Sequence, residues 1–253
     1  MAKVNVYGID GSEKETITLP KVFNTSLRPD IIQKAFNVLH SNRRTPYGAY
    51  RYAGVEHATA SVGKGRGMSR VPRLTQGRQA ALAPCVVGGR RAHPPRADRV
   101  WKEKINKKER DLAKHSALAA TAQKEVVVKR GHKFNESLTL PIVVEDAFGN
   151  LTKTKEVLGS FEKIGIIDDV YRSKDGKHIR AGKGKTRGRR YKTPKSILII
   201  STDENIKKGS KNISGVDVVS PKDVNIEHLA PGGMSGRLTV ITQSSLRSLG
   251  GES

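Results

Sequence analysis

The chain has 253 residues, a formal net charge of +23 and a pI near 10.3. A pI above about 9 is typical of nucleic-acid-binding proteins, so a polyphosphate is the expected ligand class. The single cysteine, Cys85, excludes an intramolecular disulfide and favours a reducing compartment. The first residues lack the apolar region of a signal peptide, and no run reaches the roughly 18 apolar residues of a membrane span, so we expect a cytoplasmic protein.

The first forty residues predict a pair of strands and a helix. Apolar and polar residues alternate between Val4 and Leu19 on both sides of Asp10-Gly11, which indicates two short strands joined by a turn. From Pro29 to His40 apolar residues recur at helical spacing, and Pro29 suits a first helical turn. One face of this helix should therefore contribute to the core.

A second helix follows further along the chain. Asn106 and Glu109 are spaced like a capping box, and small apolar residues continue the helical pattern toward Gln123. Beyond it, short apolar runs alternate with helical patterns. The predicted strands are 142–144, 197–200, 216–219 and 238–241, and the predicted helices are 152–163, 203–208, 226–229 and 244–249. This alternation predicts an α/β fold, with a mostly parallel sheet covered by helices on both faces, a Rossmann-like topology without a nucleotide site.

A basic segment, residues 43–104, separates the first two predicted helices; we call it the arm. It holds 14 basic residues against Glu56, Asp98 and Glu103, so it contributes +11 of the net charge of +23. Repeated glycines and prolines interrupt every helical pattern, and no apolar run of strand length remains. Loops of this length are either functional or disordered, and a polyanion such as folded RNA would supply the partner that the arm needs.

A second basic loop, residues 172–195, has eleven basic residues against Asp175 alone. A single run of this kind is most often a solvated tail, but two internal, glycine-punctuated runs favour nucleic-acid binding. We expect one globular body, residues 1–42 with 105–253, that carries both excursions. The candidate RNA-binding residues are Arg43, Arg44, Arg51, Lys64, Arg66, Arg70, Arg73, Arg78, Arg90, Arg91, Arg96, Arg99, Arg180, Lys183, Lys185, Arg187, Arg189 and Arg190.

Patterns that resemble catalytic or cofactor sites fail on inspection. Gly184-Lys185-Thr186 ends like a phosphate-binding loop, but the required first glycine position is Ile179. The run Gly63–Gly67 approaches a dinucleotide fingerprint, yet its third glycine position is Met68 and no strand precedes it. Cys85 near His93 is no catalytic constellation, and the histidines lack zinc-site spacing. We expect no catalytic residue, metal or cofactor.

Four aromatic residues lie near the two ends of the arm: Tyr47, Tyr50, Tyr52 and Trp101. Stacking on RNA bases and packing at the root of the arm are equally plausible roles for them.

Seven stretches together resemble the fourth large-subunit ribosomal protein family, in its archaeal and eukaryotic branch. They are Ser41–Gly48 (SNRRTPYG), Gly63–Arg73 (GKGRGMSRVPR), Gly88–Pro95 (GGRRAHPP), Leu140–Asp146 (LPIVVED), Lys153–Glu156 (KTKE), Arg180–Arg190 (RAGKGKTRGRR) and Leu229–Arg237 (LAPGGMSGR). The resemblance covers nearly the whole chain and favours an archaeal source, because the long basic tail of many eukaryotic members is missing.

The resemblance implies a non-enzymatic constituent of the large ribosomal subunit that binds its rRNA and supports early assembly. The body would lie on the outside of the subunit, and the arm would reach the polypeptide exit tunnel near a narrowing formed with a neighbouring ribosomal protein. The implied partners are the rRNA, neighbouring ribosomal proteins and the nascent peptide, with no membrane and no homo-oligomer. By position, the implied tunnel-lining residues are Arg66, Met68, Ser69, Arg70, Val71, Pro72 and Arg73.

Three other functions remain as alternatives. A DNA-compacting protein would share the charge, but no helix-turn-helix or minor-groove module is evident. An RNA-modifying enzyme would need a cofactor loop after a strand, and neither 142–146 nor 197–202 is followed by one. Binding to an anionic bilayer is disfavoured because the cationic residues lie in segments rich in glycine and proline rather than on an amphipathic helix.

Overall fold

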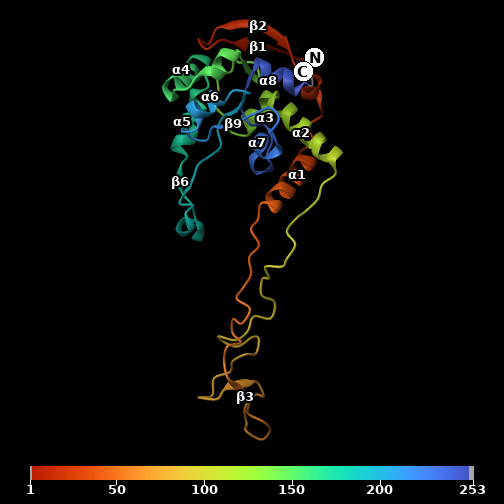
Figure 1. The fold of residues 1–253 in the computed structure, drawn as a ribbon, viewed down its shortest axis with the longest axis vertical. Helices are drawn as coiled ribbons and strands as arrows, with labels where there is room; N and C mark the ends of the chain where they lie inside the picture. Colours follow the sequence, from red (N-terminus) through yellow and green to blue (C-terminus); the bar gives the residue numbers. More distant parts are fainter. Residues whose placement is uncertain (1, 251–253) are drawn as a thin grey trace. The chain divides into compact units, whose positions relative to one another are not determined.

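The computed structural model describes residues 2–250 and divides into two compact units. One unit, the body, comprises the residues up to His40 and those from Lys104 onward. The other, the arm unit, is Ser41–Glu103. Figure 1 shows the body as a sheet flanked by helices.

Six strands form the central sheet of the body, in the order β2-β1-β5-β10-β8-β9. Their bounds are β1 Lys3–Tyr7, β2 Glu13–Thr18, β5 Ile142–Val144, β8 Leu198–Ile200, β9 Asp217–Val219 and β10 Thr239–Thr242. β1 and β2 pair antiparallel, and all other neighbours pair parallel. The predicted, mostly parallel sheet is therefore confirmed, with one antiparallel edge strand.

Helices cover both faces of this sheet. The body helices are α1 Pro29–Asn42, which runs on into the arm unit, α2 Lys107–Thr121, α3 Lys124–Lys129, α4 Thr154–Ile164, α5 Ile167–Asp175, α6 Glu204–Ser210, α7 Ile226–Leu229 and α8 Gln243–Leu249. Short 3-10 helices are η1 Lys21–Asn24, η2 Asp146–Asn150, η3 Lys183–Arg187 and η4 Pro231–Gly233.

The buried side chains form two clusters, one on each face of the sheet. In β5, Ile142 and Val144 belong to the cluster with Phe161 of α4, whereas Val143 belongs to the cluster with Leu118 of α2. Successive strand residues point to opposite faces, so a strand buried on both faces reads as a continuous apolar run. This explains why these strands lack polar alternation in the sequence.

Several predicted elements have the expected bounds, and one local prediction is wrong. Gly11 has φ +78° in the turn between β1 and β2, and Gly165 ends α4 in the left-handed region. The prediction of a capping box is wrong, because the Asn106 side chain accepts no hydrogen bond from the backbone at the start of α2. Glu109 instead accepts hydrogen bonds from Lys34 Nζ of α1, at 3.0 and 3.2 Å. The short helices α3 and α5 were not expected.

The arm unit contains no helix between residues 43 and 103, as its composition predicts, and Ala81 is its one buried residue in the described structure. The expectation that no strand would form was wrong. β3 (Thr59–Ser61) and β4 (Pro72–Leu74) pair antiparallel, and a bridge joins Arg73 to Ala80. Pairing over three residues satisfies backbone groups without needing a core, which is why apolar patterning did not indicate it.

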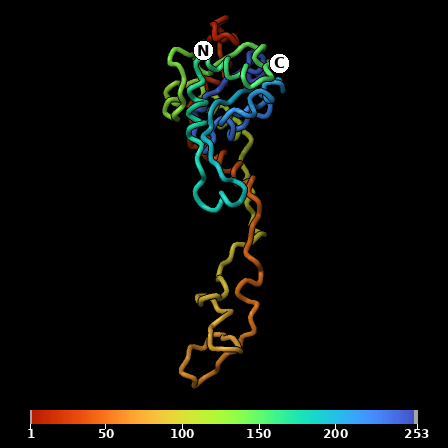
Figure 2. Tube along the Cα trace, turned by 90° about the vertical axis from the view of Figure 1, so that its left-hand side faces the viewer, coloured from red at the N-terminus to blue at the C-terminus, as the bar shows by residue number. Residues whose placement is uncertain are grey.

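Part of the second basic loop is regular structure. Residues 172–175 complete α5, while β6 (His178–Ile179) and β7 (Tyr191–Lys192) form a short hairpin around η3. Figure 2 shows this hairpin, in cyan, leaving the sheet and helices of the body.

Candidate nucleic-acid interface

The arm unit consists of two chain segments that run side by side near its root (Figures 1 and 2). Ser41 Oγ donates to the carbonyl of Trp101 at 2.7 Å, and the Ala49 amide donates to the carbonyl of Pro95 at 2.9 Å. A Cβ added to Gly48 would lie 2.8 Å from the opposite backbone, so only glycine allows this close approach. The root of the arm therefore has its own internal order.

Stacked rings and guanidinium groups gather beside this pairing. The rings of Tyr47 and Trp101 stack with centroids 6.0 Å apart, and the guanidinium carbons of Arg44 and Arg99 lie 5.0 and 4.3 Å from the Trp101 centroid. Cation–π contacts of this kind hold both partners in place. Packing at the root is thus observed for Trp101, while Tyr47 remains 61% exposed.

The other two tyrosines pair with each other. Their rings meet edge to face at 5.8 Å, and the Tyr50 hydroxyl donates to Glu56 Oε1 at 2.6 Å. This hydrogen bond raises the pKa of Tyr50, and both Tyr50 and Tyr52 are more than half exposed.

Arg73 stabilises the loop between β3 and β4. Its guanidinium donates to the carbonyl of Arg78 at 2.6 Å and to Ser69 Oγ at 3.0 Å. Of the seven residues expected to line a tunnel, Arg66, Ser69 and Arg70 are exposed and the other four are partly buried. Arg73 is thus turned toward its own loop.

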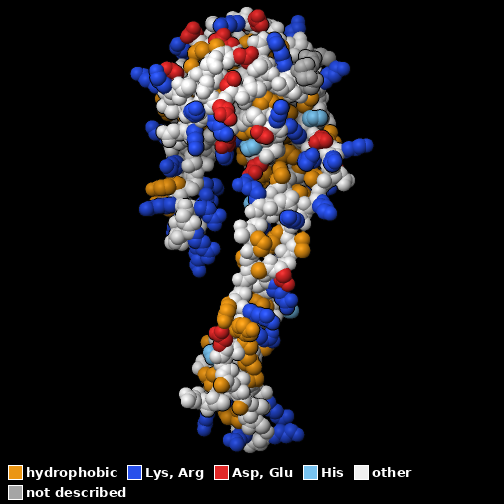
Figure 3. Space-filling model, in the orientation of Figure 1, with side chains coloured by type: hydrophobic (Ala, Val, Ile, Leu, Met, Phe, Trp, Pro, Cys, Tyr) orange, Lys and Arg blue, Asp and Glu red, His pale blue; other side chains and the backbone are white. Residues whose placement is uncertain are grey.

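Sixteen of the eighteen candidate RNA-binding residues are exposed; the exceptions are Arg73 and Arg180, which are half-buried. Figure 3 shows Lys and Arg side chains gathered on the second basic loop and at the far end of the arm unit. An array of exposed cations without a core suits phosphate contacts, because each guanidinium or ammonium can replace a counterion.

The second basic loop holds its shape through its own side chains. Arg180 donates to the carbonyls of Arg189 and Tyr191, at 3.2 and 3.4 Å. The Tyr191 ring is half exposed and lies 4.7 Å from Lys177 Nζ and 5.8 Å from the Arg190 guanidinium carbon. The sequence reading missed Tyr191, although a tyrosine in a run of cations was the available signal.

A buried carboxylate, Asp169 of α5, anchors the base of this loop. It accepts bonds from Arg172 Nε at 2.8 Å, Ser196 Oγ at 2.6 Å and the His132 ring at 3.0 Å. Burial alone would raise the pKa of Asp169, but these partners hold it well below its usual value. Arg172 also donates to the carbonyl of Lys195 at 2.8 Å. Arg172, one of the eleven basic residues of the second basic loop, is therefore half-buried and bonded within the body.

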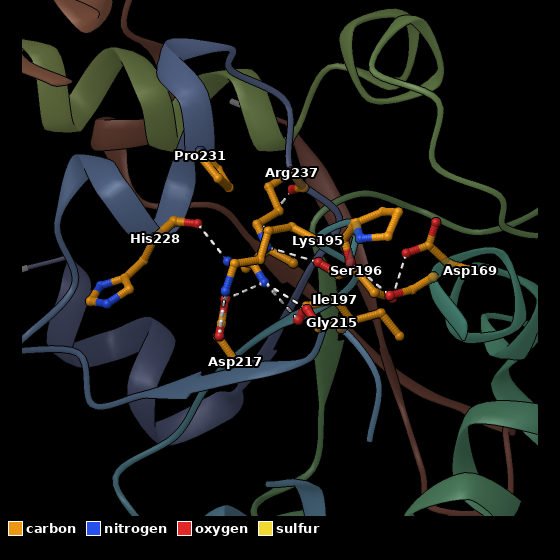
Figure 4. A network of polar contacts seen from close by, with 12 residues as sticks. Asp169, Lys195, Ser196, Ile197, Gly215, Asp217, His228, Pro231 and Arg237 are labelled. Atoms are coloured by element: carbon orange, nitrogen blue, oxygen red, sulfur yellow. Dashed lines mark hydrogen bonds and ion pairs between the residues drawn. The ribbon is translucent and has the colours of Figure 1, made fainter. Parts of the chain in front are cut away.

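Arg237 lies two residues before β10 and is fully buried, and Figure 4 shows its guanidinium among backbone carbonyls. It donates to the carbonyls of Ser196, His228, Ile197 and Gly215 and pairs with Asp217 Oδ2 at 2.6 Å. Burial lowers the pKa of Arg237, whereas Asp217 opposes that shift. Burial would raise the pKa of Asp217, but Arg237 and Lys195 together lower it. No pattern in the sequence indicated that Arg237 would be buried.

In the part of the chain that the structure describes, no three His, Cys, Asp or Glu side chains gather as a metal site requires. Among residues 2–250 no helix has the length and apolar character needed to cross a membrane.

Comparison with known proteins decides the family. A profile of the Ribosomal protein L4/L1 family matches residues 17–252. This chain belongs to that family. "Large ribosomal subunit protein uL4" of Methanocaldococcus jannaschii is 50% identical over 248 residues, covering 98% of both chains. The proteins of the same name from Thermoplasma acidophilum and Haloquadratum walsbyi are 45% and 46% identical, each covering at least 97% of both chains.

Membership in the L4/L1 family confirms the predicted resemblance and its archaeal character, since all three relatives come from archaea. It also confirms the expected class, a structural ribosomal protein rather than an enzyme. The parallel sheet of this member of the family does not by itself imply a cofactor site, in keeping with the rule that fold alone does not determine function.

Proposed function

We propose that the chain is a constituent of the large subunit of the cytoplasmic ribosome, and that it binds the rRNA of that subunit through the arm and the second basic loop. The observation that carries this proposal is the exposure of sixteen cationic side chains on two segments that bury almost nothing. A place in the large subunit is supported by the relatives, which are named as large-subunit proteins and match this chain along nearly their whole length.

The arm would contribute to assembly because its order is only local. The hydrogen bonds at the root and the β3–β4 hairpin are formed, but Ala81 is the only buried residue in the described arm unit. Folding rRNA around such a segment supplies the contacts that the segment cannot make alone, so protein binding and RNA folding are coupled.

The end of the arm would line part of the polypeptide exit tunnel, beside a neighbouring ribosomal protein and against the nascent peptide. The exposed members of the expected set, Arg66, Ser69 and Arg70, are the side chains available for this contact. Met68, Val71, Pro72 and Arg73 would support the loop from within, since they are partly buried. A photo-crosslinking residue at position 66 should label stalled nascent chains, while one at exposed Lys155 of α4 should not.

The central test removes the end of the arm. We expect a chain in which residues 63–89 are replaced by a short Gly-Ser linker to retain a folded body, because the described core lies almost entirely outside this segment. Its fraction co-sedimenting with the large subunit on a sucrose gradient should fall, and the intact chain should leave the subunit only at high salt.

Two outcomes would contradict the proposal. The intact chain could remain at the top of the gradient at low salt, which would rule out stable incorporation. The shortened chain could be unfolded by circular dichroism, which would show that the arm is part of the core. Stronger binding to duplex DNA than to structured rRNA would favour the alternative of DNA compaction.

A further inference from the structure

An open cleft of about 710 Å³ lies within the arm unit, next to the paired root segments. Its lining consists of one aromatic ring, one imidazole, two prolines, three guanidinium groups and one carboxylate. These belong to Tyr47, His93, Pro94, Pro95, Arg91, Arg96, Arg99 and Asp98. Ligand pockets commonly span about 300–1,000 Å³, so the cleft has room for one nucleotide.

A stacking surface is already assembled at this cleft. Tyr47 lines it and packs against Trp101, with an interplanar angle of 21°, and Trp101 in turn contacts the Arg99 guanidinium. Unpaired RNA bases stack on exposed aromatic rings, and a ring held by neighbours loses little entropy on binding. Because Tyr47 is 61% exposed, a base can add to this column.

Arginines supply the phosphate contacts. Arg91 and Arg96 line the cleft with exposed side chains. A guanidinium pairs with a phosphate through two parallel hydrogen bonds, which fixes the orientation of the nucleotide as well as its charge.

Asp98 is the unusual member of the lining. It is one of only three acidic residues in the arm, and within the described residues it makes no ion pair. A carboxylate weakens general phosphate binding, yet it accepts two hydrogen bonds side by side. Guanine presents two adjacent donors on its Watson–Crick edge, N1–H and the N2 amino group, whereas uracil presents one donor between two acceptors.

We infer that this cleft binds an unpaired guanine nucleotide of RNA. The base stacks on Tyr47, its N1–H and N2 amino group donate to Asp98, and its flanking phosphates pair with Arg91 and Arg96. The inference rests on the proposed function, because it requires an RNA partner, and it adds base selectivity to a surface otherwise built for phosphates.

Trp101 gives a direct readout, since it is the only tryptophan of the chain and contacts Tyr47. The intact protein is titrated with three RNA hairpins that share one stem: fully paired, with one bulged guanosine, or with one bulged uridine. The guanosine bulge should bind roughly tenfold more tightly than the paired stem, as a good bidentate base contact allows. It should also change the Trp101 fluorescence more than the uridine bulge does.

Variants separate the base contact from general electrostatics. Asp98→Asn should weaken binding of the guanosine bulge but strengthen binding of the paired stem, because the charge lost is repulsive to phosphate. Tyr47→Phe should retain the preference for the bulge and Tyr47→Leu should lose it. The double change Lys185→Ala and Arg187→Ala, in the second basic loop, should weaken all three hairpins equally.

The outcomes are distinguishable. Equal affinity of the intact protein for the three hairpins, or an Asp98→Asn effect of the same sign on all of them, overturns the guanine site and leaves the proposed function intact. Failure to bind any hairpin at moderate salt overturns the proposed function, and the guanine site with it.

Discussion

Arg237 illustrates how one buried cation can join several strand ends. Its guanidinium donates to carbonyls just before two strands of the sheet, β8 and β9, and to the last turn of α7, while Arg237 itself precedes β10. A buried guanidinium is tolerated only when its donors are satisfied and a carboxylate balances its charge. Asp217, which starts β9, supplies that carboxylate, so β8, β9 and β10 are fastened at one edge.

We expect Arg237→Leu to lower the free energy of unfolding by about 3 kcal/mol, because it removes one donor from each of four carbonyls and leaves the half-buried Asp217 paired with Lys195 alone. Arg247→Leu is the matched control, since Arg247 is exposed on α8, and should change it by less than about 0.5 kcal/mol. Urea unfolding of both variants measures the difference. Equal values would mean that the buried network contributes nothing.

His132 makes the stability of the body depend on pH. Burial is the main cause that lowers the pKa of His132 below its ordinary 6.5, and the bond to Asp169 opposes that shift. The imidazole therefore binds a proton near pH 6.5 in the unfolded chain but not in the folded chain. The free energy of unfolding consequently falls as the pH drops below about 6.5. Asp169, whose pKa is depressed in the folded state, adds a second loss below about pH 4.

Replacing His132 by Gln should flatten the stability curve between about pH 7 and 5, where one proton contributes up to about 1.4 kcal/mol per pH unit. His115→Gln, at an exposed position of α2, should leave the curve as it is. Denaturant unfolding at a series of pH values tests this. A curve for His132→Gln parallel to that of the unchanged chain would contradict the assignment.

The buried ion pairs and hydrogen bonds of Arg237 and Asp169 could not be predicted from sequence. A charged side chain can be buried only where the fold brings its partners, from distant segments of the chain, into contact with it. The partners of Asp169 show this, because Ser196 and His132 lie 27 and 37 positions away from it in the sequence. The exposed cations were predictable, since solvation requires no partner from elsewhere in the chain.

At the scale of elements, α4 shows that a glycine can stabilise a helix at one position and destabilise it at another. Gly165 caps the helix with φ +90°, and an added Cβ would lie 3.1 Å from Asn135. Gly159 lies inside the same helix with nothing within 4 Å of an added Cβ. Gly165→Ala should therefore destabilise by about 1 kcal/mol, and Gly159→Ala should stabilise by up to about 1 kcal/mol. Changes of the same sign in thermal unfolding would refute this contrast.

The elements that the sequence did not reveal are those whose local preferences disagree with their structure. α3 contains Val126-Val127-Val128, a β-branched run, but Val127 is fully buried, so packing overrides propensity. α5 ends in the basic run from Arg172, which hid its helical period. Longer periodic segments such as α1 and α4 were placed within two residues of their observed bounds.

At the scale of the whole molecule, the alternation of apolar runs and helical patterns predicted the α/β class but not the order of strands. β10 is last in the sequence and yet lies between β5 and β8. Apolar runs show that strands are buried on both faces but do not say which strands pair, because pairing depends on contacts between segments about 40 to 100 residues apart. The arm was predictable because its net charge and its glycines and prolines exclude a core within it.

The two basic surfaces should make separable contributions to RNA binding. Each phosphate contact contributes about 0.7 to 0.9 to the slope of log affinity against log salt. Replacing residues 63–89 removes four exposed cations, since Arg73 is turned inward, so the slope should fall by about 3. Replacing the five exposed cations of the second basic loop by alanine should lower the slope by about 4, and the effects of the two changes should add. These cations are Lys183, Lys185, Arg187, Arg189 and Arg190.

Fluorescence anisotropy with an rRNA fragment at several salt concentrations measures each slope. A slope that one of the changes leaves unaltered would show that the cations of that segment do not contact phosphate.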